Sequence, residues 1–140
     1  MSVYTGHTAI VVSDFDKSLA FYCGLLGLHV AVDFGEASAE ALTKDPNEKM
    51  RFALLAADDG LQCIELFQFK GAEQRKLEGK IRHDDLWSSH VCFQSDDVEA
   101  LYERLVAAGT EVDIPLTDAQ GYKFAYLYDP DGYMVELIAK

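Results

Sequence analysis

The pattern of apolar and polar positions repeats between the two halves of the chain. Residues 7–14 form a β-branched apolar run that begins with His and ends with Asp, and residues 90–97 repeat this seven-residue step from His to Asp. Each run is followed by apolar positions spaced three or four apart, over residues 15–26 and 98–106, and each such pattern stops at a glycine. This spacing predicts an amphipathic helix after a strand in both halves.

The two halves also end alike. A strand-like stretch follows each predicted helix, and an Asp-Gly pair then occurs at residues 59–60 and again at residues 131–132. Asp-Gly between apolar runs is a strong signal for a β-hairpin. The strand after each pair carries one glutamate near its middle, Glu65 in the first copy and Glu136 in the second.

The repeat predicts an α+β fold of two paired βαβββ modules, together forming one domain over residues 1–140. The first module covers about residues 3–69 and contains an additional polar loop at about 37–49. A polar linker of about residues 70–86 precedes the second module, which covers about residues 87–140.

Composition and charge narrow the classes of function. The chain has 140 residues, of which 49% are hydrophobic and 11% aromatic, so it can bury a sizeable core. Its 12 Lys and Arg against 24 Asp and Glu give a formal charge of −12. This charge argues against nucleic acid and against anionic membranes as partners, since both require a basic surface.

The three cysteines and the N-terminal residues predict the cellular compartment of the protein. Cys23, Cys63 and Cys92 form no C-x-x-C pair and have apolar neighbours, which predicts reduced thiols in the core. Residues 1–7 have neither the basic nor the apolar region of a secretion signal. We therefore expect a cytoplasmic protein.

Two histidines and two glutamates occupy equivalent positions in the repeat. An ionised carboxylate on an apolar strand costs several kcal/mol unless it is paired, protonated or bound to a metal. Strand alternation puts each glutamate on the sheet face opposite its core neighbours. The simplest explanation of all four is one divalent cation, with the ligands His7, Glu65, His90 and Glu136.

The chemistry of these four ligands restricts which metal ions can bind. Two imidazoles and two carboxylates suit Ni²⁺ or Zn²⁺, with Co²⁺, Mn²⁺ and Fe²⁺ as alternatives. Four protein ligands leave two positions of an octahedral site for water or a bidentate substrate, which is a catalytic arrangement. His29 and His83 lie outside the repeat pattern, and we expect them to be ordinary hydrogen-bonded residues.

The chain resembles the vicinal oxygen chelate superfamily over nearly its whole length. The most specific segments are Ser-Leu-Ala-Phe-Tyr at residues 18–22, Leu-Gly-Leu at 26–28, and Asp-Pro-Asp-Gly-Tyr-Met-Val-Glu-Leu at 129–137. The order His, Glu, His, Glu is that of glyoxalase I (lactoylglutathione lyase). The superfamily also contains epimerases, fosfomycin-resistance proteins, bleomycin-binding proteins and extradiol dioxygenases.

The resemblance implies concave mixed sheets around the metal and a metal-dependent isomerase or lyase. Its small-molecule substrate would be a hemithioacetal or hydroxy-ketone, converted by proton transfer through a metal-bound ene-diolate. Glu136 would be the first choice of base, with Glu65 as its symmetric partner. The resemblance also implies a homodimer with metal sites between subunits.

Two positions depart from the glyoxalase I pattern. Val11 stands where that family has an arginine for a glutathione carboxylate, and Phe69 stands where it tends to have asparagine. Two alternatives therefore remain open: another enzyme of the superfamily, such as an epimerase or dioxygenase, and a metal-free module that binds a drug or metabolite.

Two further sets of residues are candidates for contact with the substrate. Aromatic residues are predicted to line an apolar pocket or to pack in the core, namely Trp87, Phe67, Tyr122, Phe124 and Tyr126. Cations gather in the linker, either as solvated residues or as an anchor for an anionic substrate group, at Arg75, Lys76, Lys80 and Arg82.

Overall fold

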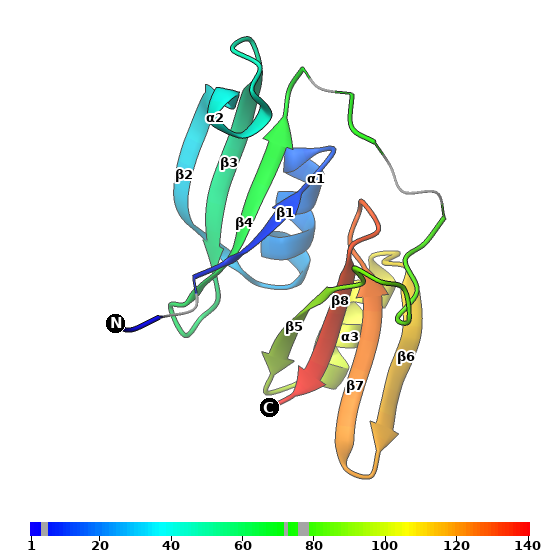
Figure 1. The fold of residues 1–140 in the computed structure, drawn as a ribbon. Helices are drawn as coiled ribbons and strands as arrows, with labels where there is room; N and C mark the ends of the chain where they lie inside the picture. The colour runs from blue at the N-terminus through cyan, green and yellow to red at the C-terminus, as the bar shows by residue number, and fades with distance from the viewer. Residues whose placement is uncertain (4–5, 72, 76–78) are drawn as a thin grey trace. The chain divides into compact units, whose positions relative to one another are not determined.

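Two four-stranded sheets, one in each half of the chain, organise the structure (Figure 1). The structure is a computed structural model that describes residues 1–3, 6–71, 73–75 and 79–140. The chain divides into two units, Met1–Gln74 and Arg75–Lys140. The division falls inside the predicted linker.

The first unit has the element order that the repeat predicts. Its sheet has the strand order β1-β4-β3-β2, in which β1 runs parallel to β4 and the other pairs are antiparallel. The elements are β1 (Thr8–Val11), α1 (Phe15–Leu19), the π-helical η1 (Ala20–Leu25), β2 (His29–Ser38), α2 (Glu40–Thr43), β3 (Lys49–Ala56) and β4 (Gln62–Phe69).

The second unit has the same topology. Its sheet order is β5-β8-β7-β6, again with a parallel first pair and antiparallel neighbours. The elements are β5 (His90–Ser95), α3 (Val98–Ala107), β6 (Val112–Ala119), β7 (Tyr122–Tyr128) and β8 (Met134–Ala139). The prediction of two βαβββ modules is confirmed.

The helices begin where the sequence predicts and are followed by the expected glycines. The side chain of Asp14 accepts a hydrogen bond from the backbone N–H of Lys17, and Asp97 does the same for Ala100. These caps satisfy N–H groups that have no partner within the helix. The glycines that follow the two helices adopt positive φ angles, 93° at residue 27 and 83° at residue 109, which a side chain would strain.

Three details differ from the prediction. The first helix continues as η1 in π geometry, where the N–H of Leu26 donates to the carbonyl of Phe21 at 2.9 Å. The predicted polar loop contains α2. Strands β2 and β6 extend beyond the predicted residues 28–34 and 110–114, because cross-strand pairing with β3 and β7 continues through polar positions that periodicity does not mark.

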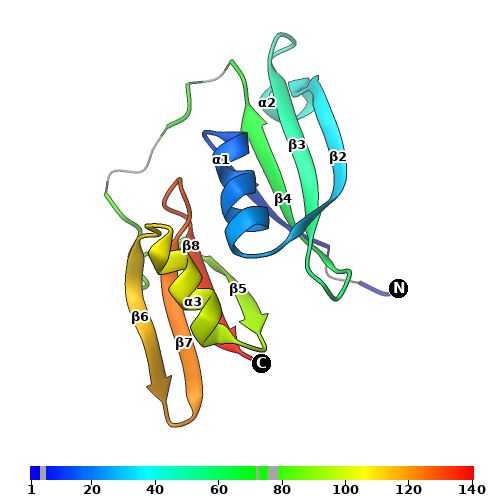
Figure 2. The ribbon, with the colours of Figure 1, turned by 180° about the vertical axis from the view of Figure 1, so that it is seen from behind.

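Each sheet has one face that carries the helix of its unit and one face without it, which we call the open face (Figure 2). On the helix side of the first unit, Ile64 and Leu66 of β4 are fully buried. Val135 and Leu137 of β8 are fully buried in the second unit. The glutamates alternate with these residues and so lie on the open faces, as predicted.

Glu48 holds together the end of the first sheet. Glu48 is only 5% exposed. Its Oε1 atom accepts hydrogen bonds from the backbone N–H groups of Lys70 and Gly71, at 3.0 and 2.9 Å. The carboxylate thereby joins the end of β4 to the turn before β3. A Cβ atom at residue 71 would lie 2.9 Å from Glu48 Oε2, so this close approach favours glycine.

We expect Glu48→Ala to lower the free energy of unfolding by about 1–3 kcal/mol, because two buried N–H groups lose their acceptor. Urea unfolding followed by circular dichroism measures this change. Glu40→Ala is the matched control, since Glu40 is exposed on α2. A loss for Glu48→Ala no larger than for the control would contradict the role of this carboxylate.

Candidate functional site

The first predicted pair, His7 with Glu65, lies on the open face of the first unit. Glu65 pairs in register with Ala9 of the parallel strand β1, and His7 precedes Ala9 by two residues, on the same side of the chain. The distance between His7 Nε2 and Glu65 Oε2 is 2.8 Å. The carboxylate side chain is 15% exposed and the imidazole side chain 40% exposed. We call this pair the first half-site.

The second half-site, His90 with Glu136, repeats this arrangement in the second unit. Glu136 pairs in register with Cys92 of β5, and His90 again precedes that partner by two residues. His90 Nε2 lies 3.2 Å from Glu136 Oε2, and the carboxylate side chain is 11% exposed. The structure therefore places each predicted histidine beside the predicted glutamate of its own unit.

The donor chemistry of each half-site fits a divalent cation. Two ligands that lie each about 2.1 Å from one metal, at a right angle, are separated by about 3 Å, close to both observed N–O distances. Among the described residues, no group of three or more His, Cys, Asp or Glu side chains could hold a metal. Each half-site by itself supplies two donors.

Two protonated side chains flank Glu136 from the neighbouring strands. The hydroxyl of Tyr126, on β7, donates to Glu136 Oε1 at 2.9 Å. Burial, and then the hydrogen bond to Glu136 and its negative charge, raise the pKa of Tyr126 to about 12. The same causes raise the pKa of the Cys92 thiol to about 12. Both groups therefore remain protonated at neutral pH.

Glu65 has apolar neighbours in the corresponding positions. Its register partners are Ala9 on β1 and Leu54 on β3, where Glu136 has Cys92 and Tyr126. Neither an alanine nor a leucine side chain can donate a hydrogen bond. The two half-sites thus match in their His–Glu pair and differ in what surrounds the carboxylate.

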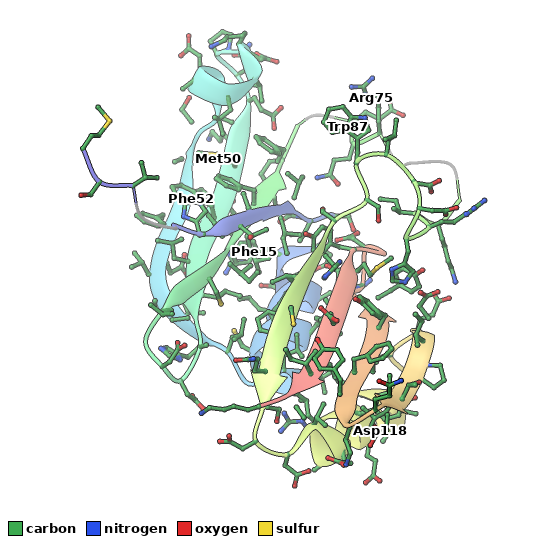
Figure 3. The ribbon with its side chains drawn as sticks, turned by 60° about the horizontal axis from the view of Figure 1, so that its bottom comes forward. Phe15, Met50, Phe52, Arg75, Trp87 and Asp118 are labelled. Atoms are coloured by element: carbon green, nitrogen blue, oxygen red, sulfur yellow. The ribbon has the colours of Figure 1, made fainter. Side chains whose placement is uncertain are left out.

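Aromatic side chains extend the open face of the first unit. Phe52, labelled on β3 in Figure 3, stacks on Phe34 and Phe67, with ring centroids 4.5 and 5.4 Å apart. Phe67 stacks on Phe69 in turn. Val11, opposite Phe67 in the register, is 55% exposed. The surface beside the first half-site is therefore apolar at the two positions where the glyoxalase I pattern has polar residues.

Three of the five aromatics predicted for the pocket are neighbours on β7. Phe124 and Tyr126 lie next to each other on β7, with centroids 6.1 Å apart. Trp87 is 96% exposed and Tyr122 51% exposed (Trp87 is labelled in Figure 3). Tyr122 contacts Phe124 in turn, with ring centroids 5.8 Å apart, and Phe67 lies on β4 of the other unit.

Two of the four linker cations form ion pairs with acidic residues of the same unit. Lys80 forms an ion pair with Glu111, and Arg82 forms one with Asp84. Arg75 is exposed, and residue 76 lies outside the described residues. These pairs leave less positive charge for a substrate anion than the sequence alone indicates.

The cysteine prediction holds in one respect and is wrong in another. Cys23, Cys63 and Cys92 are all free thiols, as predicted. Cys92, however, is exposed, and the other two are only partly buried, so they are not core residues. Apolar neighbours in sequence misled the prediction, because strand alternation puts Cys92 on the open face with His90.

The comparisons with known proteins agree with this architecture. The Glyoxalase/Bleomycin resistance protein/Dioxygenase superfamily model matches residues 5–137, and the chain belongs to this superfamily. Within the described residues, no helix is long and apolar enough to cross a membrane.

Individual relatives extend this similarity. A Pseudomonas putida protein named lactoylglutathione lyase is 30% identical over 94% of this chain and 82% of its own length. A glyoxalase family protein from Bacillus cereus superposes with a TM-score of 0.86 at 19% identity, covering 99% of this chain and 95% of that one. A trypanothione-dependent glyoxalase I from Leishmania major has a TM-score of 0.67 at 25% identity, covering 99% and 87%.

We expect Cys92 to react slowly with iodoacetamide at pH 8 despite its exposure. A pKa near 12 instead of the ordinary 9.0 leaves roughly 1000-fold less thiolate, and the higher nucleophilicity of such a thiolate offsets only part of that loss. Glu136→Gln removes the adjacent negative charge but leaves the burial, which is the larger cause, and should accelerate alkylation measurably. Mass spectrometry of the peptide containing Cys92 measures both rates. Equal rates in the two proteins would contradict the contact between Cys92 and Glu136.

Proposed function

We propose that the protein is a metal-dependent isomerase of the glyoxalase I type, acting on a small molecule with two adjacent oxygens. The observation that carries this proposal is the pair of His–Glu half-sites at identical register positions on two open sheet faces. Membership of the superfamily and the name of the P. putida relative support the same class of reaction.

His7, Glu65, His90 and Glu136 would together hold one divalent cation, with Ni²⁺ or Zn²⁺ as the first candidates. The cation would supply Lewis acidity for the two adjacent substrate oxygens. The side chains of the protein then determine where the proton goes.

Glu136 is the proposed base. Its carboxylate takes a proton from the carbon between the sulfur and the carbonyl of a hemithioacetal and returns it to the neighbouring carbon. The product is the thioester of a 2-hydroxy acid, and no external oxidant or reductant is needed because the hydrogen only moves between carbons. Glu65, the equivalent residue in the first half-site, would serve the opposite side of the substrate.

The thiol carried by the substrate is the variable part of the proposal. Val11 and Phe69 give this chain an apolar surface where the glyoxalase I pattern has groups for glutathione. The L. major enzyme is described as trypanothione-dependent, so carriers other than glutathione occur on this fold. A panel of thiols therefore belongs in the activity assay.

A second copy of the chain is the proposed partner. Each unit carries only two of the four ligands, and each open face exposes apolar side chains such as Phe34 and Tyr122. A homodimer in which the first half-site of one subunit combines with the second half-site of its partner would cover these faces. The interface would be self-complementary, as twofold symmetry requires.

The assay that tests this function measures thioester formation from methylglyoxal and several thiols by ultraviolet absorbance. We expect activity with Ni²⁺ or Zn²⁺ that disappears on chelation. Glu136→Gln should lower kcat by at least about 100-fold, because an amide oxygen can still ligate but cannot accept a proton.

His90→Ala is the companion variant and should weaken metal binding more than Glu136→Gln does, since alanine supplies no ligand. Metal bound without thioester formation from any thiol would favour another reaction of the superfamily. A wild-type protein without affinity for divalent cations would favour a metal-free binding module.

Mixing two inactive variants tests the site between subunits. His7→Ala and His90→Ala, unfolded together and refolded as a mixture, should regain activity, because a mixed dimer contains one site with both lesions and one intact site. Native mass spectrometry verifies that mixed dimers are present. If these dimers are inactive, each chain supplies all four of its own ligands.

A further inference from the structure

We propose that Tyr126 positions both predicted ligands of the second half-site and fixes the orientation of the Glu136 carboxylate. This inference rests on the proposed metal site. It assigns a positioning role to a residue that the repeat does not mark, since the two halves differ at this register position.

The hydroxyl of Tyr126 fixes one carboxylate oxygen. Tyr126 and Glu136 are direct cross-strand partners on β7 and β8, so their side chains lie next to each other on the open face. The hydroxyl donates to Oε1 at 2.9 Å, while Oε2 lies 3.2 Å from His90 Nε2. A carboxylate held in this way cannot exchange its two oxygens without breaking the hydrogen bond, so Oε2 stays beside the imidazole.

The aromatic ring of the same residue contacts the second ligand. The Tyr126 and His90 rings meet edge to face, with centroids 5.3 Å apart and planes at 90°. This geometry is favourable for aromatic pairs and restricts rotation of the imidazole. One side chain therefore touches the carboxylate through its hydroxyl and the imidazole through its ring.

The segment before β5 holds Tyr126 itself. The His83 ring packs against the Tyr126 ring at 86°, with centroids 4.6 Å apart. His83 Nε2 is in turn 2.9 Å from Asp113 Oδ2 on β6. Lys80 anchors the same segment through its ion pair with Glu111. Tyr126 therefore packs against His83, which is itself held by its contact with Asp113.

The first half-site provides an internal comparison. Leu54 occupies the register position opposite Glu65 and offers neither a hydroxyl nor a ring. The second half-site is therefore the pre-organised one, and the first half-site has more freedom to adjust. Outer residues that orient metal ligands commonly contribute 10–100-fold to metal affinity.

The test uses Co²⁺ binding, measured by calorimetry and by the visible absorption of the bound ion, alongside kcat and KM. Tyr126→Phe removes only the hydroxyl and should weaken Co²⁺ binding about 10-fold. Its absorption spectrum should shift, and kcat should fall while KM stays the same. Tyr126→Leu reproduces the residue of the first half-site and should weaken binding further, up to about 100-fold.

Tyr102→Phe is the matched control, because it removes a hydroxyl from a tyrosine on α3, the helix that covers the other face of the same sheet. Its Co²⁺ affinity should remain within about twofold of wild type. Tyr126→Phe with wild-type affinity and spectrum would overturn the positioning role alone and leave the proposed function standing. Wild-type protein that binds no Co²⁺ would overturn the metal site and, with it, this inference.

Discussion

An acidic side chain on an otherwise apolar sheet face is the constraint on which the rest of this structure depends. Each sheet buries one face under its helix, and the residues flanking Glu65 and Glu136 in sequence are fully buried there. The glutamates then necessarily lie on the open face, where a carboxylate needs a partner because leaving water is costly. In both units a histidine lies two residues before the residue that pairs with the glutamate on the adjacent strand, and this repeated pairing makes the two open faces candidates for a common site.

The repeat made most of this arrangement predictable. Strand alternation and the repeated step from His to Asp are local properties, so the sequence alone predicted His7, Glu65, His90 and Glu136 as candidate ligands and the faces on which they lie. The helix ends were equally predictable from Asp14, Asp97 and the glycines that follow the helices. The hairpins were predictable from the two Asp-Gly pairs. These signals are local, and their effect does not depend on the partner strand.

The surroundings of the carboxylates were not predictable, because they depend on cross-strand register. Tyr126 faces Glu136 only because β7 and β8 align as they do, and the β6–β7 pairing contains irregularities that no periodicity reveals. Two half-sites with the same ligand types therefore differ in the groups around the carboxylate, since Tyr126 donates a hydrogen bond to Glu136 and Leu54 stands opposite Glu65.

The central claim is that four side chains from two half-sites share one cation, and X-ray absorption spectroscopy of the Ni²⁺-loaded protein tests it most directly. The account predicts a shell of nitrogen and oxygen ligands with outer scattering from two imidazoles, reduced to one imidazole in both His7→Ala and His90→Ala. Scattering from a sulfur ligand such as Cys92, or a spectrum unchanged in either variant, would contradict the shared site.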